Sequence, residues 1–324
     1  MLTYTPSNIR MWSRLGPSGA FGLAALELAA INEKVVMLSA DMAHASGLER
    51  FMSAYPDRFY NVGIAEQNLV GIASGMANEG FIPYATTYAT FLAARALDQI
   101  KVNMGYMKKK IKLVGVLGGL SAGIFGSTHI SVEDISVFRV IPNITILSPA
   151  DCCEVIKCTM AAAENDSPVY IRLTGEPNMP SIYSGDYEFE IGKSIKLVEG
   201  TDVAVIATGS MVYNSIKAVE LLREKSISCR VVNMHTIKPL DLDAVLDTGG
   251  FRLVVTVEEH SILGGLGGAV AEALSESGTP HRLLRIGLKD TYIHAAEYSY
   301  LLDELGLSPN KIAARIAGAL GQTC

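Results

Sequence analysis

Short apolar runs of strand length alternate with stretches of helical periodicity along most of the chain. Strands are predicted at residues 35–38, 112–117, 144–147 and 169–173, and helices at 21–30, 91–105 and 150–164. Alternation of this kind is typical of a largely parallel sheet with helices on its faces, because parallel strands need crossover connections. The pattern therefore predicts a doubly wound α/β fold.

The alternation stops once and then resumes. Residues 175–185 contain two glycines and two prolines and are predicted to form a linker. An entry strand or hairpin is predicted at 187–197, followed by strands at 203–207, 229–233 and 253–257 and helices at 213–224 and 269–277. A chain of 324 residues is long enough for two cores. We therefore predict two doubly wound α/β domains with mostly parallel sheets, residues 1–185 and 186–324.

Charge and composition exclude several classes of protein. The formal net charge of −6 argues against a nucleic-acid partner, and no apolar run has the ~20 residues that span a membrane. The first twenty residues, with two prolines and two arginines, do not resemble a secretion signal. The five cysteines form no C-x-x-C pair, so neither a metal site nor a disulfide framework is indicated. An odd cysteine count suits the reducing cytoplasm, where we expect the protein.

The turn at residues 61–65 brings one carboxylate, Glu66, to the start of an apolar helix. The residues before it, 59–62, are predicted to form a short buried strand, and apolar residues follow Glu66 at helical spacing. A carboxylate in a first helical turn either interacts with the helix dipole or exchanges a proton with a ligand. The residues alone leave both interpretations open.

A second glycine-rich segment lies at residues 262–268, after a strand and before a helix. Its spacing differs from the dinucleotide-binding fingerprint, and the chain has no G-x-x-x-x-G-K-[ST] phosphate loop. We expect a close approach of backbones there, at a contact between domains or subunits.

An ordered series of motifs resembles the transketolase family. In chain order the series is Ser39-Ala40-Asp41, Gly63-Ile64-Ala65-Glu66-Gln67, Thr87 to Leu92, Gly126 to His129 with Glu133-Asp134, and Ile141 to Asp151. Residues 234–241 and 258–261 resemble the C-terminal domain of that family. The whole series is most similar to the C-terminal subunit of transketolases that are split into two chains.

This resemblance implies a thiamine diphosphate enzyme that transfers a two-carbon ketol unit from a ketose to an aldose. Residues 1–185 would bind the pyrimidine ring of the cofactor. The family holds the diphosphate and Mg²⁺ with a G-D-G run and later asparagines, and no G-D-G run occurs here. The resemblance therefore implies an N-terminal diphosphate-binding partner subunit, which brings most contacts to Mg²⁺ or another divalent cation. We expect an α2β2 heterotetramer that is active only when both subunits are present.

The resemblance also assigns roles to individual residues. Glu66 would bind the pyrimidine N1′ in protonated form, favoured by apolar surroundings, and Phe91 would stack on the ring with Tyr88 one helical turn earlier. Asp41 matches a carboxylate near the cofactor, although a turn-capping role is an open alternative. His129 would bind the oxygens of the sugar and relay protons.

Three departures from the family concern the substrate. Phe125 stands where the family usually has an aspartate, Gly175 where an arginine holds the substrate phosphate, and Ser18 in place of another arginine. Arg172 is the nearest guanidinium, and His44 could face the substrate channel. Each lost charged hydrogen bond weakens phosphate binding by ~1.5 to 3 kcal/mol. We therefore expect a sugar other than the standard pentose phosphates.

Three alternative functions remain open at this point. The β subunit of a 2-oxoacid dehydrogenase shares the G-I-x-E-Q turn, but its usual H-H-S-Q loop is missing. A deoxyxylulose-phosphate synthase is normally one longer chain with an aspartate in place of Phe125. A non-catalytic assembly subunit would not need Glu66, Phe91 and His129. The second domain offers no clear catalytic set, and we expect it to pack between subunits.

Overall fold

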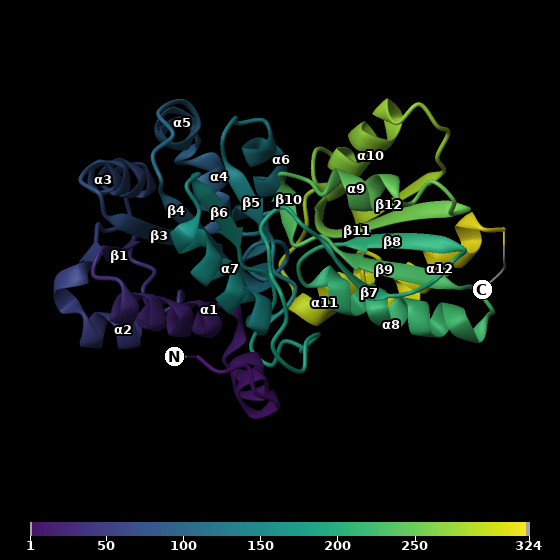
Figure 1. Cartoon of the computed structure of the whole chain (residues 1–324), viewed down its shortest axis with the longest axis horizontal. Helices are drawn as coiled ribbons and strands as arrows, with labels where there is room; N and C mark the ends of the chain where they lie inside the picture. The colour runs from purple at the N-terminus through teal and green to yellow at the C-terminus, as the bar shows by residue number, and fades with distance from the viewer. Residues whose placement is uncertain (1, 322–324) are drawn as a thin grey trace.

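A seven-stranded sheet forms the centre of the N-terminal lobe. The computed structural model describes residues 2–321, which form two lobes side by side (Figure 1). The strand order of the first sheet is β10-β5-β6-β4-β3-β1-β2, and all neighbours are parallel except β10 and β5. The bounds are β1 (Val35–Ser39), β2 (Phe59–Asn61), β3 (Ile82–Tyr88), β4 (Lys112–Val116), β5 (Thr145–Leu147), β6 (Val169–Arg172) and β10 (Thr236–Lys238).

Helices cover both faces of this sheet, and the residues of β1 alternate between them. Val35 and Met37 pack with α1 (Pro6–Ile31) and α7 (Cys152–Glu164). Val36 and Leu38 pack with α3 (Glu66–Asn78), α4 (Ala89–Ala94), α5 (Leu97–Ile100) and α6 (Asp134–Arg139). Strands that are buried on both faces read as continuous apolar runs, which is why β1, β4, β5 and β6 were predictable from the sequence. Short helices complete the lobe: α2 (Glu49–Ala54), η1 (Pro56–Arg58), η2 (Lys101–Tyr106) and η3 (Gly123–Thr128).

The C-terminal lobe is built on a five-stranded sheet of order β12-β11-β8-β9-β7, in which only β7 is antiparallel to its neighbour. Its strands are β7 (Ile195–Val198), β8 (Val203–Ala207), β9 (Cys229–Asn233), β11 (Leu253–Ser261) and β12 (Leu283–Leu288). Its helices are α8 (Met211–Glu224), α9 (Leu242–Leu246), α10 (Leu266–Glu276), α11 (Tyr298–Glu304) and α12 (Pro309–Ala319). The predicted fold class, two doubly wound α/β domains with mostly parallel sheets, is confirmed.

Several elements differ from the sequence prediction. The predicted helix at 91–105 is interrupted after α4 and ends in the π-helical turn η2. The strand β2 is an edge strand with Tyr60 and Asn61 exposed, rather than a buried strand. The strand β10 belongs to the C-terminal half of the sequence, yet it completes the edge of the first sheet.

The glycine-rich segment brings the two lobes into contact. The buried Glu258 at the end of β11 accepts hydrogen bonds from the backbone N–H groups of Leu266 (2.7 Å) and Gly267 (2.8 Å) at the start of α10. A Cβ at Gly265 would lie 2.0 Å from Oε2 of Glu258, so a larger residue does not fit. Arg139 of the first lobe donates to the carbonyl of Gly264 at 2.7 Å. The segment therefore lies at a contact between the two lobes, which the Arg139 side chain makes with the glycine backbone.

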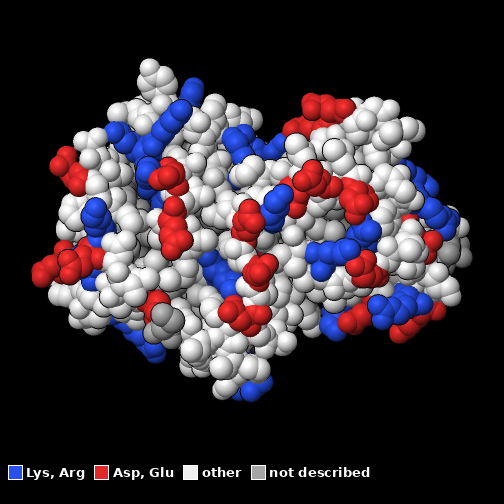
Figure 2. Space-filling view, viewed as in Figure 1, with Lys and Arg blue, Asp and Glu red and all other residues white. Residues whose placement is uncertain are grey.

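Acidic and basic side chains are interspersed over the face of the molecule that Figure 2 shows. Within residues 2–321, no helix combines the length and the hydrophobicity that crossing a membrane requires.

Candidate functional site

A turn at Gly63 places the start of α3 at the carboxyl edge of the first sheet. Gly63 has a φ of +74°, a conformation that a residue with a side chain rarely adopts. Asn61 Oδ1 accepts hydrogen bonds from the backbone N–H groups of Gly63 (3.0 Å) and Asp41 (3.1 Å), which ties the ends of β1 and β2 together. Glu66 then begins α3 with its side chain buried.

Four rings form an aromatic cluster beside this helix start: Tyr88, Phe91, Phe125 and His129. Tyr88 ends β3 and Phe91 lies in α4, with their ring centres 5.1 Å apart. His129, directly after η3, has its ring 5.2 Å from Tyr88, 5.3 Å from Phe91 and 5.3 Å from Phe125. Burial raises the pKa of the Tyr88 hydroxyl above its usual value. The fold thus brings three predicted cofactor or catalytic residues and one predicted substrate residue into contact.

Arg95 joins Glu66 to this cluster, and the sequence analysis missed it. Its Nη1 donates to Oε1 of Glu66 at 2.8 Å, and its guanidinium carbon lies over the Phe91 ring, 3.6 Å from the ring centre. Tyr88, Phe91 and Arg95 follow the i, i+3, i+7 spacing of one helix face, a signal that could have found the arginine. We had expected apolar surroundings for Glu66. The structure instead places the Arg95 cation beside its carboxylate.

The space between Glu66 and Phe91 suits a flat group that carries N–H donors. A guanidinium is planar and offers several N–H donors, and it already contacts both the carboxylate and the ring face. An aminopyrimidine ring is also planar, and its N1′ can share one proton with a carboxylate in the place of a guanidinium N–H. The residues present therefore fit the pyrimidine part of thiamine diphosphate.

Asp41 and His44 lie at the same edge of the sheet, outside this cluster. Asp41 has a φ of +58°, and its Oδ1 accepts a hydrogen bond from Nδ2 of Asn61 at 3.0 Å, which favours the turn-stabilising interpretation. His44 pairs with Glu49, and its side chain is 94% exposed. Neither side chain contacts Glu66 or the aromatic cluster among the described hydrogen bonds and ring contacts.

Arg172 is not available to a substrate, which corrects the prediction made for it. Its side chain is fully buried, and its Nε donates to Oδ2 of Asp134 at 2.7 Å. Its Nη2 donates to the carbonyls of Ser131 (3.1 Å) and Glu259 (3.0 Å). The ion pair with Asp134 raises the pKa of Arg172 further, against the effect of burial. The arginine therefore joins the two lobes.

A cavity of about 400 Å³ opens beside Phe125. Its polar lining side chains include Ser18, Ser121, Glu176 and Glu297, and none of the described residues that line it is Lys, Arg or His. Burial, and secondarily the nearby Glu297, raise the pKa of Glu176 above its usual value. A phosphate dianion would meet two carboxylates here and no cation.

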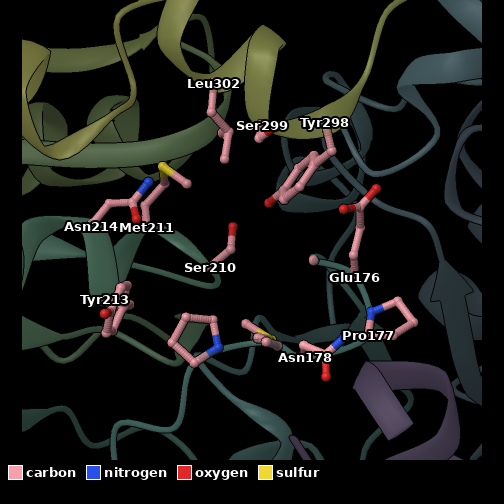
Figure 3. A pocket seen from close by; sticks show the side chains of 13 residues that line it. Glu176, Pro177, Asn178, Ser210, Met211, Tyr213, Asn214, Tyr298, Ser299 and Leu302 are labelled. Carbon is pink, nitrogen blue, oxygen red and sulfur yellow. The ribbon is translucent and has the colours of Figure 1, made fainter. Parts of the chain in front are cut away.

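A smaller cavity of about 240 Å³ adjoins the first, and the two share Glu176 and Tyr298 (Figure 3). The hydroxyl groups of Tyr298 and Ser210 point toward its centre in this view. Both hydroxyls donate to Glu259, Tyr298 at 2.7 Å. These groups already have partners in the protein.

Metal-binding chemistry was not predicted for this chain. Among residues 2–321, no group of three or more His, Cys, Asp or Glu side chains is arranged to hold a metal ion. The four cysteines within that range are buried and free, and Cys324 lies outside it.

Two family models match most of the chain. Residues 17–178 match the transketolase pyrimidine-binding domain, and residues 192–312 match the transketolase C-terminal domain. A putative transketolase C-terminal section from Methanocaldococcus jannaschii is 38% identical over 93% of this chain and 95% of its own length. A 6-deoxy-6-sulfo-D-fructose transketolase subunit from Clostridium sp. strain MSTE9 is 38% identical over 89% of each chain.

A solved structure with the same architecture has a known assembly. It is a split-gene transketolase described as an inactive β4 tetramer, with a TM-score of 0.84 and 37% identity over 94% of this chain and 98% of that one. The chain therefore belongs to the transketolase family, whose enzymes depend on thiamine diphosphate, and it carries the pyrimidine-binding and C-terminal domains of that family.

Proposed function

We propose that this chain is one subunit of a split transketolase that transfers a two-carbon ketol unit from a ketose donor to an aldose acceptor. The observation that carries the proposal is the buried Glu66 at the start of α3, which contacts the same planar N–H group, the Arg95 guanidinium, as the face of the Phe91 ring. When bound, thiamine diphosphate supplies the nucleophilic carbon that holds the ketol unit.

The residues of the chain have separate tasks in this function. Glu66 holds a proton at N1′ of the pyrimidine, and its burial keeps water away from that hydrogen bond. Phe91 and Tyr88 pack against the pyrimidine, and Asp41 keeps the turn before α3 in place through Asn61. His129 contacts both aromatic rings, and in this function it binds hydroxyl groups of the sugar and relays protons.

We propose that an N-terminal subunit completes the site with the contacts to the diphosphate and Mg²⁺. The subunit and section names of the relatives support a partner of this kind. The expected assembly is an α2β2 heterotetramer. We also propose that the two domains divide between residues 185 and 186, between the two family matches.

We propose that the sugar lacks a phosphate at the end that enters the cavity beside Phe125. Glu176 and Glu297 line that cavity, and Ser18 and Gly175 line it where the family places arginines. Two carboxylates without a compensating cation repel a phosphate dianion. A relative that is named for a sulfonated fructose shows a non-standard sugar in this family, although that sugar is anionic.

The test mixes the purified chain with the N-terminal subunit, thiamine diphosphate and Mg²⁺. Donors are D-xylulose and its 5-phosphate, and acceptors are D-glyceraldehyde and its 3-phosphate, with products followed by mass spectrometry. We expect ketol transfer only with both subunits present and preferentially between the unphosphorylated sugars. Acyl transfer to lipoamide, or no transfer from any ketose, would contradict the function. Efficient transfer between the phosphorylated pair alone would contradict only the substrate class.

A further inference from the structure

Arg95 makes the two contacts that the proposed function reserves for the cofactor. Its guanidinium binds the Glu66 carboxylate at 2.8 Å and lies 3.6 Å from the centre of the Phe91 ring. A carboxylate oxygen and a ring face that are already engaged cannot accept a second planar group in the same place. The guanidinium and a pyrimidine ring that uses Oε1 of Glu66 and the same face of Phe91 therefore exclude each other.

We propose that the Arg95 side chain is a displaceable occupant of the pyrimidine site, so that the cofactor must push the guanidinium away from Glu66 and Phe91 in order to bind. The inference rests on the proposed function, because it uses Glu66 and Phe91 as the pyrimidine contacts. It adds a competition within the chain that sets the affinity for thiamine diphosphate.

The backbone of Arg95 is held by hydrogen bonds, whereas its side chain is half exposed. Its N–H donates to the carbonyl of Phe91 at 3.0 Å, and its carbonyl accepts from Nε2 of Gln67 at 3.1 Å. The Arg95 side chain is 49% exposed, whereas that of Glu66 is 7% exposed. The guanidinium can therefore turn toward solvent without any change in α3 or α4.

The Arg95 guanidinium is held only weakly at Glu66 and Phe91, because the arginine of the ion pair is half exposed. An exposed ion pair and an exposed cation–π contact are each weak, so their combined loss corresponds to about a 3- to 30-fold change in binding. A guanidinium held this weakly pairs with the Glu66 carboxylate in the free protein, and the cofactor can still displace it.

The experiment measures the dissociation constant of thiamine diphosphate by calorimetry, with the chain reconstituted with its N-terminal subunit and Mg²⁺. We expect Arg95→Met to bind the cofactor about 3- to 30-fold more tightly than the wild type, because the competitor is gone. Arg95→Lys keeps the charge but loses the planar fork, and we expect an intermediate affinity. If Arg95→Met does not fold, Arg95→Gln serves in the same measurement.

Arg230 offers a matched control in the other lobe. Its Nη1 pairs with Asp247 at 2.6 Å, and its guanidinium carbon lies 4.6 Å from the centre of the Phe251 ring. Arg230→Met therefore removes the same kinds of contact far from Glu66, and we expect the wild-type affinity. In a Glu66→Gln background the gain from Arg95→Met should shrink, since the ion pair is already lost.

Two outcomes overturn the proposal in distinguishable ways. Equal or weaker binding by Arg95→Met, with a wild type that binds the cofactor normally, means that Arg95 does not compete and leaves the proposed function intact. A folded wild-type complex that binds no thiamine diphosphate refutes the proposed function, and the competition with it.

Discussion

Replacing the carboxyl group of Glu66 with an amide tests its role in catalysis separately from its contribution to packing. Glu66→Gln keeps the size of the side chain and a hydrogen bond with Arg95 or the pyrimidine, but an amide cannot hold an acidic proton at N1′. We expect the turnover of the reconstituted enzyme to fall by about 10²- to 10⁴-fold while the thermal unfolding midpoint stays close to that of the wild type. Steady-state ketol transfer and circular dichroism measure the two effects.

The same helix supplies the control for this variant. Glu79 is the exposed C-terminal cap residue of α3, and Glu79→Gln makes the same chemical change one helix length away. Its turnover should match that of the wild type. Turnover of Glu66→Gln near the wild-type value would contradict the proton-holding role.

Whether a contact between two side chains could be predicted depended on how close the two residues are in the sequence. Tyr88 and Phe91 are three residues apart, so their contact could be expected from helical spacing. Arg95 continues that spacing, but an arginine on a helix is usually solvated, and its pairing with Glu66 depends on how α3 and α4 pack. Arg172 was wrongly predicted to bind substrate because its partner Asp134 is 38 residues away in the chain.

At the scale of elements, β11 and the start of α10 are joined by the Glu258 carboxyl group, whose protonation is coupled to folding. Burial is the main cause that raises the pKa of Glu258 from 4.5 to about 7, against the hydrogen bonds from Gly267 and Leu266. Between these two values the folded state binds more protons than the unfolded state. The stability that Glu258 contributes is therefore present below about pH 4.5 and is lost as the pH rises through about 7.

Glu258→Gln tests this coupling because glutamine does not titrate. We expect the free energy of unfolding of the wild type, relative to the variant, to decrease as the pH rises from about 5 to about 8. Urea denaturation of both proteins at several pH values measures the difference, and groups that titrate equally in both proteins cancel. A difference that stays constant, or that increases with pH, would contradict the raised pKa.

Strands were predicted correctly where a run of apolar residues marks them in the sequence, and they were missed where such a run is short or broken. The strands β1, β4 and β8 contain buried runs of four or five apolar or small residues, and they appear close to where they were expected. The strand β3 was missed because Pro83 and four threonine or tyrosine residues break its apolar run, although it lies in the middle of the sheet. The strand β10 has three residues, too few for any periodicity.

At the scale of the whole molecule, one of the buried apolar clusters extends across both lobes. Leu69 and Leu92 of the first lobe belong to the same buried cluster as Ile206 and Val254 of the second. The strand β10 extends from the C-terminal half of the chain to pair with β5. Alternation of strands and helices predicted two domains, but it contains no information about a strand that crosses between sheets or about a shared core.

The buried pair of Arg172 and Asp134 lies at this junction, where the Arg172 guanidinium also reaches the Glu259 carbonyl of the second lobe. The guanidinium holds the pKa of Asp134 below its usual value, so the carboxylate stays charged in the core. Arg172→Met leaves that charge buried without its cation, and we expect a loss of about 3 to 5 kcal/mol in the free energy of unfolding.

The double variant Arg172→Met with Asp134→Asn separates the charge from the packing. The double variant should recover part of the lost free energy of unfolding, because it buries no uncompensated charge. The rest of the loss should persist, because both variants lack the hydrogen bonds from Arg172 to the backbone carbonyls. Urea denaturation followed by the fluorescence of Trp12, the single tryptophan and a buried one, measures all three proteins. Lys217→Met, which breaks the exposed pair with Glu220, should leave the unfolding curve unchanged. A double variant less stable than Arg172→Met would mean that packing and hydrogen bonding, rather than the buried charge, determine the stability of the junction.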